Sequence, residues 1–543
     1  MSNYERAVKF LKKNENHILP LVLFIGIFSF VSFYTLSANI HGDSKMHILF
    51  AKEIVKHGNL LQYSPYEVFM RSDGELTNIP IYYPLTTHTT IALFYMIGGE
   101  EVLKFFSPFF AALTALFIYF LLKHINKYGA FFVAIFAIVL NSPRFMMTPL
   151  LEQSLLFAMV ASLYYYYTFL RKLNKKYLLL AGLFLGVTLA IKQQGLYFFT
   201  IIFIHCISVG IYKKIKKNET KLLKQFVLMI VITSVVCSGP LIDQMQRNGV
   251  LIQLNYKFNI PPFLESQFPA DLEAVRELHE IKGYSIDYKT LLEIFPVYLL
   301  HPFYYNHSVE ILKQHDILQF LGYLLINSFL FTIGLIFIYR NDKMLSFLLI
   351  IIFITTMFVT YITDTFPIQY NNIGVAILSI CLLFGLFGMK NVIRNLKIRK
   401  IVVSLIILIS VITIVNSYVT EVHEPLWKNP GRYDDYYLNA YKKMGEYVQN
   451  NTPKDAIFLT GGGIGTAFCY YSERRSLWIT EFGNAKVPLI FKTKNEEEAL
   501  HWLEYYNISY IFIDMRQTTC RGVNDYIPLQ GLLDYVDSSS HFK

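Results

Sequence analysis

Asp43 and His47, near the start of the chain, have the chemistry of a proton-transfer site. They lie in the segment 42–58, which opens with Gly-Asp, typical of a helix N-cap, and ends at a glycine, typical of a C-cap. At about 100° per residue they share one face of the predicted helix with apolar side chains. The lysines take the opposite face: Lys45, Lys52 and Lys56. We predict an amphipathic helix with its lysines toward water or lipid headgroups and Asp43 turned inward, although Asp43 could also serve only as the cap.

The composition places this helix in a membrane protein. The 543 residues are 54% hydrophobic and 16% charged, with a mean hydropathy of +0.38, whereas soluble domains carry about 25% charged residues. The net charge of +10 comes from lysines and arginines clustered between apolar runs. That placement is typical of loops beside a membrane, and it argues against a nucleic-acid partner.

Eleven apolar segments predict membrane-spanning helices. A bilayer core of about 30 Å needs about 20 apolar residues per helix. The predicted spans are 18–38, 103–122, 129–142, 149–170, 177–191, 195–212, 224–241, 317–339, 344–362, 369–388 and 400–419. The segments 129–142 and 177–191 are short, so we expect them to be tilted or covered by neighbours.

The loop charges predict the orientation of these spans. Lysines and arginines are concentrated in the N-terminal segment and in every second loop, whereas the intervening short loops hold almost none. By the positive-inside rule, the N-terminus lies in the cytoplasm and the C-terminus is extracytoplasmic. The Lys-, Ile-, Asn- and Tyr-rich composition is typical of an AT-rich prokaryotic genome, which favours the plasma (cell) membrane over the endoplasmic reticulum.

We therefore expect an α-helical polytopic membrane protein with a small C-terminal α/β domain. Residues 1–420 form the transmembrane domain, with outer loops at 39–102 and 243–316, and residues 421–543 form the extracytoplasmic domain. The predicted elements of the tail are helices at Asp434–Gln449 and Asn495–Tyr506 and strands at Ala456–Thr460, Ser476–Thr480 and Ser509–Asp514. Cys469 and Cys520 also lie there, either as a disulfide or as two separate thiols.

Three cations on the predicted outer side are candidates for binding an anion: Arg144, Lys192 and Arg247. The positive-inside rule depletes such cations, so those that remain need a reason. Lys192 ends an apolar helix and precedes Gln-Gln-Gly, a turn that would expose backbone N–H groups, although snorkelling to the interface explains it equally well. Glu152, at the outer end of the fourth span, is a second carboxylate candidate, and headgroup contact is its alternative explanation.

The order of these landmarks resembles the GT-C membrane glycosyltransferases. These include the protein O-mannosyltransferases and the lipid A aminoarabinose transferases, with oligosaccharyltransferases as more distant relatives. Their first span is likewise followed by an acidic residue that opens an outer helix. The run Tyr82-Tyr83-Pro84-Leu85-Thr86-Thr87-His88, with the helix to Gly98–Gly99, resembles the Tyr-Pro-Pro-Leu element and second interfacial helix of the family.

Two further segments carry the resemblance. Asn141-Ser142-Pro143-Arg144 with Glu152 resembles the outer-loop arginine and acidic residue of the family, and Ala181–Gly186 with Lys192–Gly195 resembles a recurrent Ala-Gly-x-x-x-Gly…Lys stretch. The chain departs from the family at Asp43-Ser44, where many relatives have Asp-Glu. It also lacks a Trp-Trp-Asp-Tyr-Gly run, which argues against an oligosaccharyltransferase.

The resemblance implies transfer of a sugar from a polyprenyl-phosphate carrier to an acceptor on the outer face, with inversion. Such a reaction needs a carboxylate that takes the acceptor proton and a cation that stabilises the departing phosphate. The catalytic candidates are Asp43 and Glu152. The substrate-binding candidates are His47, Tyr83, His88, Arg144, Lys192 and Arg247. The sugar stays open, and so does the acceptor: a protein, a lipid or a cell-envelope polysaccharide.

Other functions remain as alternatives. We predict no cofactor, and a divalent metal would need three or four convergent ligands beyond the Asp-x-x-x-His pair. A lipid-sugar flippase or transporter would predict repeated halves and charged residues in mid-span, and the sequence has neither. A non-catalytic membrane scaffold is the third possibility. Large outer loops with an amphipathic acidic helix fit an enzyme better than either alternative.

Overall fold

The computed structural model describes residues 3–37, 43–59, 61, 63–70, 76–80, 85–140, 149, 151–192, 194–217, 220–248, 317–362, 372–392, 401, 404, 435–460, 465–477, 487–493, 495–513, 519–521, 526–528 and 539. The chain forms two compact units. Unit 1 comprises residues 1–39, 97–239 and 286–430, and unit 2 comprises residues 40–96, 240–285 and 431–543.

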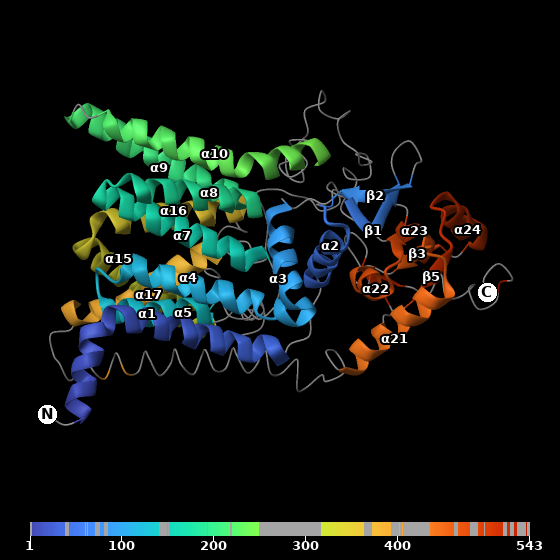
Figure 1. Ribbon diagram of the computed structural model, residues 1–543, viewed down its shortest axis with the longest axis horizontal. Helices are drawn as coiled ribbons and strands as arrows, with labels where there is room; N and C mark the ends of the chain where they lie inside the picture. The colour runs from blue at the N-terminus through green and yellow to red at the C-terminus, as the bar shows by residue number, and fades with distance from the viewer. Residues whose placement is uncertain are drawn as a thin grey trace. The chain divides into compact units, whose positions relative to one another are not determined.

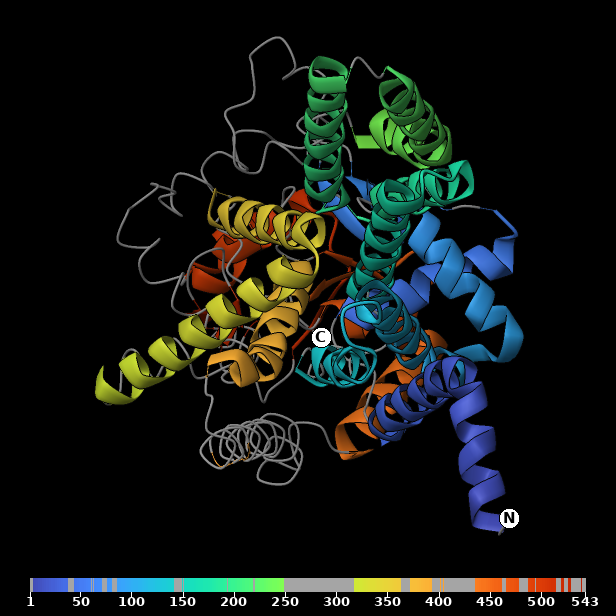
Figure 2. The ribbon, with the colours of Figure 1, turned by 90° about the vertical axis from the view of Figure 1, so that its left-hand side faces the viewer.

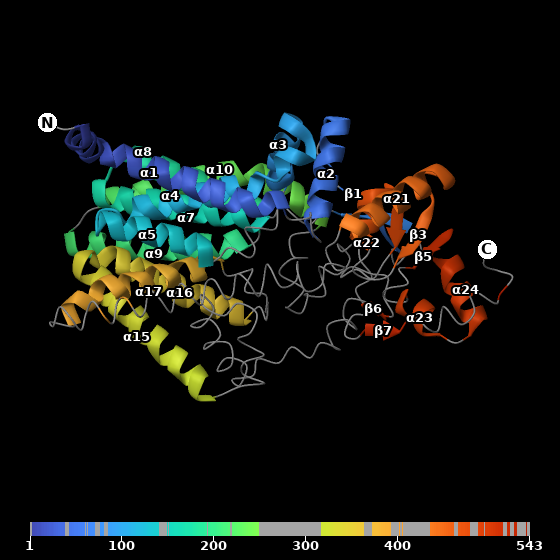
Figure 3. The same ribbon diagram turned by 90° about the horizontal axis from the view of Figure 1, so that it is seen from below.

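Unit 1 is built from long apolar helices. They are α1 (Asn3–Ser37), α4 (Phe106–Leu122), α5 (Lys127–Leu140), α7 (Leu151–Lys172), α8 (Lys175–Ile191), α9 (Gln194–Lys217), most of α10 (Lys221–Asn248), α15 (Ile317–Asn341), α16 (Lys343–Ile362) and α17 (Asn372–Val392). Figures 1 and 3 show α4, α5 and α7 side by side with nearly parallel axes. Figure 2 views this bundle from one end.

These helices coincide with ten of the eleven predicted spans. By length and composition, three of the described helices could cross a membrane: Asn14–Phe33, Gly195–Lys216 and Lys221–Pro240. The pair Thr86–Leu103 and Phe106–Leu122, bent by 104°, would make a fourth. Of the segment 400–419, only residues 401 and 404 are described. The chain is therefore mostly helical with apolar helices, and the number of eleven spans stays a prediction.

The α7–α8 hairpin brings the start of α7 beside the end of α8. The two helices pack along each other and are joined by Leu173 and Asn174 alone. Leu173 adopts a left-handed conformation with φ 52°, which ends α7. Asn174 then caps α8, because its side chain accepts a hydrogen bond from the Lys176 backbone N–H. Residues at these two helix ends, far apart in sequence, are consequently neighbours.

Two glycines hold α8 close to α10. An added Cβ at Gly182 would lie 2.9 Å from the Met229 carbonyl oxygen, and one at Gly186 would lie 2.9 Å from the Thr233 carbonyl oxygen. The Thr233 hydroxyl donates a hydrogen bond to the Gly182 carbonyl across this contact, at 3.1 Å. Small residues four apart allow helix backbones to approach closely in membranes. The Ala-Gly-x-x-x-Gly stretch is therefore a packing motif.

Unit 2 combines helices with a five-stranded sheet. Its elements are α2 (Asp43–His57), β1 (Tyr63–Met70), β2 (Leu76–Pro80), the start of α3 (Leu85–Leu103), α21 (Asp435–Asn451), β3 (Ile457–Thr460), α22 (Gly465–Ser472), β4 (Arg475–Leu477), α23 (Val487–Lys492), α24 (Glu496–Tyr505) and β5 (Tyr510–Phe512). A separate pair, β6 (Thr519–Arg521) and β7 (Tyr526–Pro528), is antiparallel. The helix α3 is broken at Gly98 and Gly99, and Gly99 has φ 66°.

The sheet has the order β2-β1-β4-β3-β5. β3, β4 and β5 pair in parallel, β1 pairs in parallel with β4, and β2 pairs antiparallel with β1. The strands and helices expected in the tail overlap β3, β4, β5, α21 and α24, whereas β1 and β2 were not predicted. The sheet thus joins segments from both sides of the predicted boundary between residues 420 and 421. An autonomous α/β domain over 421–543 stays a prediction.

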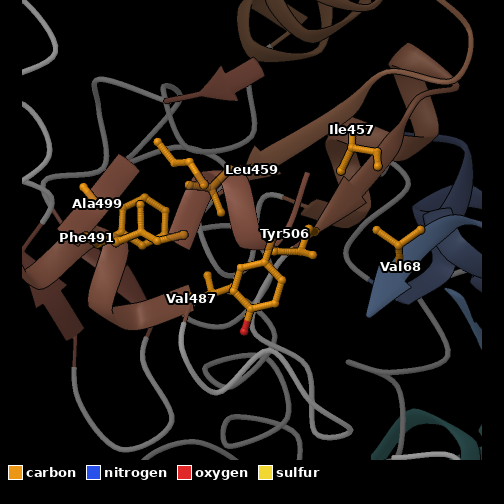
Figure 4. Close-up of a cluster of buried hydrophobic side chains, with 10 residues drawn as sticks. Val68, Ile457, Leu459, Val487, Phe491, Ala499 and Tyr506 are labelled. Carbon is orange, nitrogen blue, oxygen red and sulfur yellow. The ribbon is translucent and has the colours of Figure 1, made fainter. Parts of the chain in front are cut away.

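Helices cover both faces of this sheet. Ile457 and Leu459 of β3 point to one face, where α23, α24 and Val68 of β1 complete a buried cluster (Figure 4). The alternate residue Phe458 points to the other face and packs against Phe468 of α22. This alternation follows from the two-residue period of a strand. The core of unit 2 therefore depends on β1 as well as on the tail.

The lysine face of α2 is more covered than the sequence predicts. The expected inward residues His47, Phe50 and Ile54 are buried. Of the lysines, however, only Lys56 is exposed, while the Lys45 ammonium lies 5.1 Å from the Tyr471 ring centre and 5.9 Å from that of Tyr441. Helix α2 packs along α22, so aromatic side chains of the tail replace the expected water or headgroups at Lys45. The helical wheel alone could not foresee this partner.

Candidate functional site

Glu152 and Lys192, two separate candidates in the sequence, form one ion pair in unit 1. The Lys192 ammonium lies 2.5 Å from a Glu152 carboxylate oxygen, and the two side chains are 9% and 12% exposed. Charged groups are rarely buried unless they are paired, because an unpaired charge loses its hydration without compensation. The Lys192 side chain therefore does not extend into open water. Its positive charge is compensated by the Glu152 carboxylate.

Local helix geometry explains why these two residue types occur here. Glu152 lies in the first turn of α7, where exposed backbone N–H groups favour a negative charge. Lys192 is the C-cap residue of α8, where unsatisfied carbonyls favour a positive charge. Because the hairpin places these helix ends together, the favourable position of each charge also brings it to its partner.

A backbone hydrogen bond links Lys192 to Gly195, and the predicted exposure of backbone N–H groups in this run stays a prediction. The Gly195 backbone N–H donates to the Lys192 carbonyl at 2.9 Å. A Cβ at Gly195 would lie 2.3 Å from the Thr188 carbonyl oxygen, so only glycine fits without a shift of the backbone. Gly195 thereby allows the chain to pack closely against the end of α8, next to the C-cap residue Lys192.

A second cluster of predicted site residues lies in unit 2. The Nδ1 atom of His47 and the Nε2 atom of His88 are 3.0 Å apart, and the residues are 4% and 0% exposed. One ring must donate and the other accept, so at least one of the two imidazoles is neutral while this bond exists. The Phe50 ring meets His88 edge-on, with centroids 5.1 Å apart. This buried contact joins α2 to α3, although the two histidines are 41 positions apart in sequence.

Asp43 is the first residue of α2, one helical turn before His47. The predicted helix and the burial of its His47 face are confirmed. The inward orientation and catalytic role of Asp43 stay predictions. Arg247 lies in the last turn of α10, and its predicted role is likewise untested. Tyr83 and Arg144 lie outside the described residues.

A buried carboxylate in α2 was missed by the sequence analysis. Glu53 is 6% exposed and accepts hydrogen bonds from the Tyr66 hydroxyl at 3.1 Å and from Lys56 at 3.4 Å, with His57 Nε2 at 3.1 Å. Burial, followed by the nearby negative charge of Glu53, raises the pKa of Tyr66. The four-residue spacing of Glu53 and His57 was the available sequence signal. This group ties α2 to β1.

The described residues contain no group of three or more His, Cys, Asp or Glu side chains arranged to hold a metal ion. The histidine pair supplies two nitrogen ligands, whereas a structural or catalytic zinc site takes three or four protein ligands. Cys469 is a free, buried thiol, whose Sγ contacts the Tyr66 carbonyl at 3.7 Å. The disulfide considered for Cys469 and Cys520 is therefore not formed in this structure.

Part of the chain matches a known protein family. Residues 82–237 match the family described as dolichyl-phosphate-mannose-protein mannosyltransferase. The matched segment includes His88, Glu152 and Lys192, together with the α7–α8 hairpin. No curated protein sequence matches the chain.

Among solved structures, the chain is similar to the archaeal oligosaccharyltransferase AglB from Archaeoglobus fulgidus in complex with an inhibitory peptide and a dolichol-phosphate. The TM-score is 0.58 at 12% identity, over 91% of this chain and 70% of that chain. An oligosaccharyltransferase of Archaeoglobus fulgidus in complex with Zn and sulfate gives 0.53 at 13%, over 91% and 68%. ArnT from Cupriavidus metallidurans bound to undecaprenyl phosphate gives 0.40 at 11%, over 86% and 87%.

The fold is similar to that of AglB over 91% of the chain, and residues 82–237 match the mannosyltransferase family. The resemblance inferred from the order of motifs is thereby confirmed, and so is the prediction of a glycosyltransferase. At 12% identity the similarity to AglB is one of fold. The absent Trp-Trp-Asp-Tyr-Gly run continues to argue against oligosaccharyl transfer.

Proposed function

We propose that this protein transfers a sugar from a polyprenyl-phosphate carrier to an acceptor on the extracytoplasmic face of the plasma membrane, with inversion at the anomeric carbon. The observation that carries the proposal is the buried Glu152–Lys192 pair inside the segment that matches the mannosyltransferase family. The structure of AglB supports the choice of donor, since it was determined in complex with a dolichol-phosphate.

In this proposal Lys192 is the cation for the donor phosphate. Its ammonium has three N–H donors, and one is directed at Glu152. As the bond between the anomeric carbon and the phosphate oxygen breaks, its electron pair leaves with the phosphate, and a fixed positive charge stabilises that developing charge. Glu152 holds the ammonium in place and compensates its charge while no donor is bound.

Asp43 is the proposed general base. Its carboxylate takes the proton from the acceptor hydroxyl while the acceptor oxygen forms its bond to the anomeric carbon, so one bond forms as the other breaks. His47, near the N-terminal end of α2, and its hydrogen-bonded partner His88 are proposed to orient the acceptor substrate. Tyr83, Arg144 and Arg247 complete the proposed substrate-binding set.

The direct test is sugar transfer by the purified full-length protein in lipid nanodiscs. Synthetic polyprenyl-phosphate sugars with a labelled sugar are offered with three acceptor fractions: envelope protein, lipid and polysaccharide. We expect labelled product and released polyprenyl phosphate in equal amounts, and loss of both with Lys192→Gln. The anomeric configuration of the product, measured by NMR, tests inversion.

The matched control is Lys176→Gln, because Lys176 is an exposed lysine at the other end of α8 and carries the same charge. Donor cleavage that is equal in the wild type, Lys192→Gln and Lys176→Gln would remove Lys192 from the mechanism. Absence of transfer from every lipid-linked donor, with movement of the intact donor across the bilayer instead, would favour the flippase alternative.

A further inference from the structure

A cavity of about 690 Å³ lies in unit 1 at the end where α1, α4 and the turn into α5 meet. Its lining is basic and aromatic: His17, Lys123, His124 and Lys127 with Tyr119 and Phe120. Glu152 and Lys192 are not among its lining residues, and the lysine-rich turn at Lys123–Lys127 belongs to the predicted cytoplasmic side. The cavity is therefore separate from the proposed catalytic groups.

Helix α1 lines one side of this cavity. Pro20 lies inside α1 and has no backbone N–H, so it cannot donate to the carbonyl of Asn16 four residues earlier. Prolines account for sharp kinks in helices, and Figure 1 shows the N-terminal part of α1 turned away from the rest. Both Asn16 and Pro20 line the cavity. The cavity therefore lies beside a position at which the α1 backbone lacks a hydrogen-bond donor.

The charges around the cavity are incompletely balanced. Lys127 pairs with Glu15 at 2.9 Å, and His124 lies 3.1 Å from an Asp342 carboxylate oxygen. Within the described part of the chain Lys123 forms no ion pair, and its ammonium lies 4.8 Å from the Phe120 ring centre. Burial, and then the neighbouring charges of Lys172 and Lys127, lower the pKa of Lys123. An anion placed beside Lys123 would relieve this repulsion.

Apolar surface continues from the cavity along both neighbouring helices. Leu21 and Val22, which follow Pro20 on α1, are 58% and 51% exposed. Tyr128 and Phe132, which follow Lys127 on α5, are 59% and 51% exposed. A ligand with a phosphate and acyl chains matches this combination, because its charge meets the lysines while its chains cover the apolar residues.

We propose that this cavity binds a phosphate group, supplied by the headgroup of an anionic phospholipid in the leaflet on the lysine-rich side. Lys123 contacts the phosphate, Tyr119 and Phe120 form the wall behind it, and Leu21, Val22 and Phe132 contact the acyl chains. The site is independent of sugar transfer, so it would stand even if the protein transferred no sugar.

The test uses the purified full-length protein. Retention of phosphatidylglycerol over phosphatidylcholine is measured by native mass spectrometry, and thermal unfolding is followed with each lipid and with inorganic phosphate alone. Removing one lysine near a lipid phosphate should lower the retention of phosphatidylglycerol about fivefold. We expect that loss for Lys123→Gln, and near-wild-type retention for Lys123→Arg and for the exposed control Lys176→Gln.

Each outcome decides the proposal. Selective retention of phosphatidylglycerol that falls only with Lys123→Gln supports a lipid source. Protection by inorganic phosphate alone, lost with the same variant, supports the phosphate site with a soluble source. Equal retention in all four proteins overturns the proposal, and so does an equal loss in Lys123→Gln and Lys176→Gln. Because Lys123→Arg keeps the charge, a loss there as large as in Lys123→Gln also overturns it.

Discussion

Each of the two units contains a lysine that is shielded from water. The positive charge of this lysine is compensated differently in the two units. In unit 1 the Lys192 ammonium meets the Glu152 carboxylate at 2.5 Å. In unit 2, within the described residues, Lys45 has no carboxylate partner and faces the rings of Tyr471 and Tyr441 at 5.1 and 5.9 Å. Burial lowers the pKa of Lys45 to about 8. A ring face attracts a cation more weakly than a close carboxylate does.

The two candidate catalytic carboxylates lie in different units. Glu152 is engaged by a lysine that compensates it, whereas Asp43 opens a helix whose buried neighbour, His47, is paired with another histidine. A carboxylate held by an ammonium is a weak base, since protonation would break the pair. Glu152 is therefore the poorer base, and we propose proton transfer for Asp43 and phosphate stabilisation for the Glu152–Lys192 pair. The following predictions test that division, from the largest effect to the smallest.

Asp43→Asn should give the largest loss of activity. Asparagine caps a helix about as well as aspartate, but it cannot accept the acceptor proton, and removal of a general base typically lowers rates by about 10²–10⁴. We expect this loss in sugar-transfer assays, with unchanged expression and thermal unfolding. The control Asp455→Asn removes the same charge at an exposed position of unit 2 and should keep full activity. Near-wild-type turnover by Asp43→Asn would contradict the role of Asp43 as the general base.

Breaking the buried pair should give the largest loss of stability. Glu152→Gln leaves a buried ammonium without its carboxylate, and removal of one partner of such a pair costs about 3–5 kcal/mol of unfolding free energy. The double variant Glu152→Gln/Lys192→Gln leaves no unpaired charge and should recover much of this loss. It should nevertheless remain inactive, because the phosphate still lacks its cation. Recovery of both stability and activity would make the pair purely structural.

An exposed ion pair in the same unit provides the control for this experiment. Lys104 lies 2.7 Å from Glu101, whose side chain is 78% exposed. Exposed pairs contribute about 0.2–1 kcal/mol, so Lys104→Gln should change thermal unfolding little and leave transfer intact. A loss equal to that of Glu152→Gln would show that burial does not distinguish the two pairs.

Gly195→Ala should displace Lys192 without removing its charge. The added methyl would lie 2.3 Å from the Thr188 carbonyl oxygen, so the turn must shift, at a cost of about 1–3 kcal/mol. We expect lower thermal stability and slower transfer together. Gly26→Ala in α1 is the control, because among the described residues no side chain or neighbouring helix lies within 4 Å of its added Cβ. If Gly195→Ala lowered stability and left transfer unchanged, the position of Lys192 would not matter for catalysis.

The smallest predicted effect is the pH dependence contributed by Lys45. Its pKa is about 8 in the folded protein and 10.5 in the unfolded chain. Between these values the unfolded state binds more protons, so the contribution of Lys45 to stability rises with pH. From pH 8 to 10.5, the unfolding temperature of the wild type should therefore rise relative to that of Lys45→Met. The same difference at pH 8 and at pH 10.5 would contradict this contribution of Lys45.

Local patterns predicted many of the elements because they depend on neighbours in sequence. The cap and period of residues 42–58 predicted α2 and its buried face, and the apolar run 177–191 predicted α8 within two residues. The strands β3 and β5 were predicted by short apolar runs between turns. The strands β1 and β2 were missed, because their pairing partners determine them more than their own composition does.

The sequence by itself determined the membrane class, the helices and the residue types able to move a proton or hold a phosphate, since charge, hydropathy and spacing are properties of the chain. Only the tertiary structure decided that Glu152 meets Lys192, that His47 meets His88, and that β1 pairs with β4 more than 400 residues later. These contacts depend on which helix ends and strand edges meet in space. Sequence separations of about 40 to 400 residues carry no local signal of such meetings, because packing between elements selects the partners.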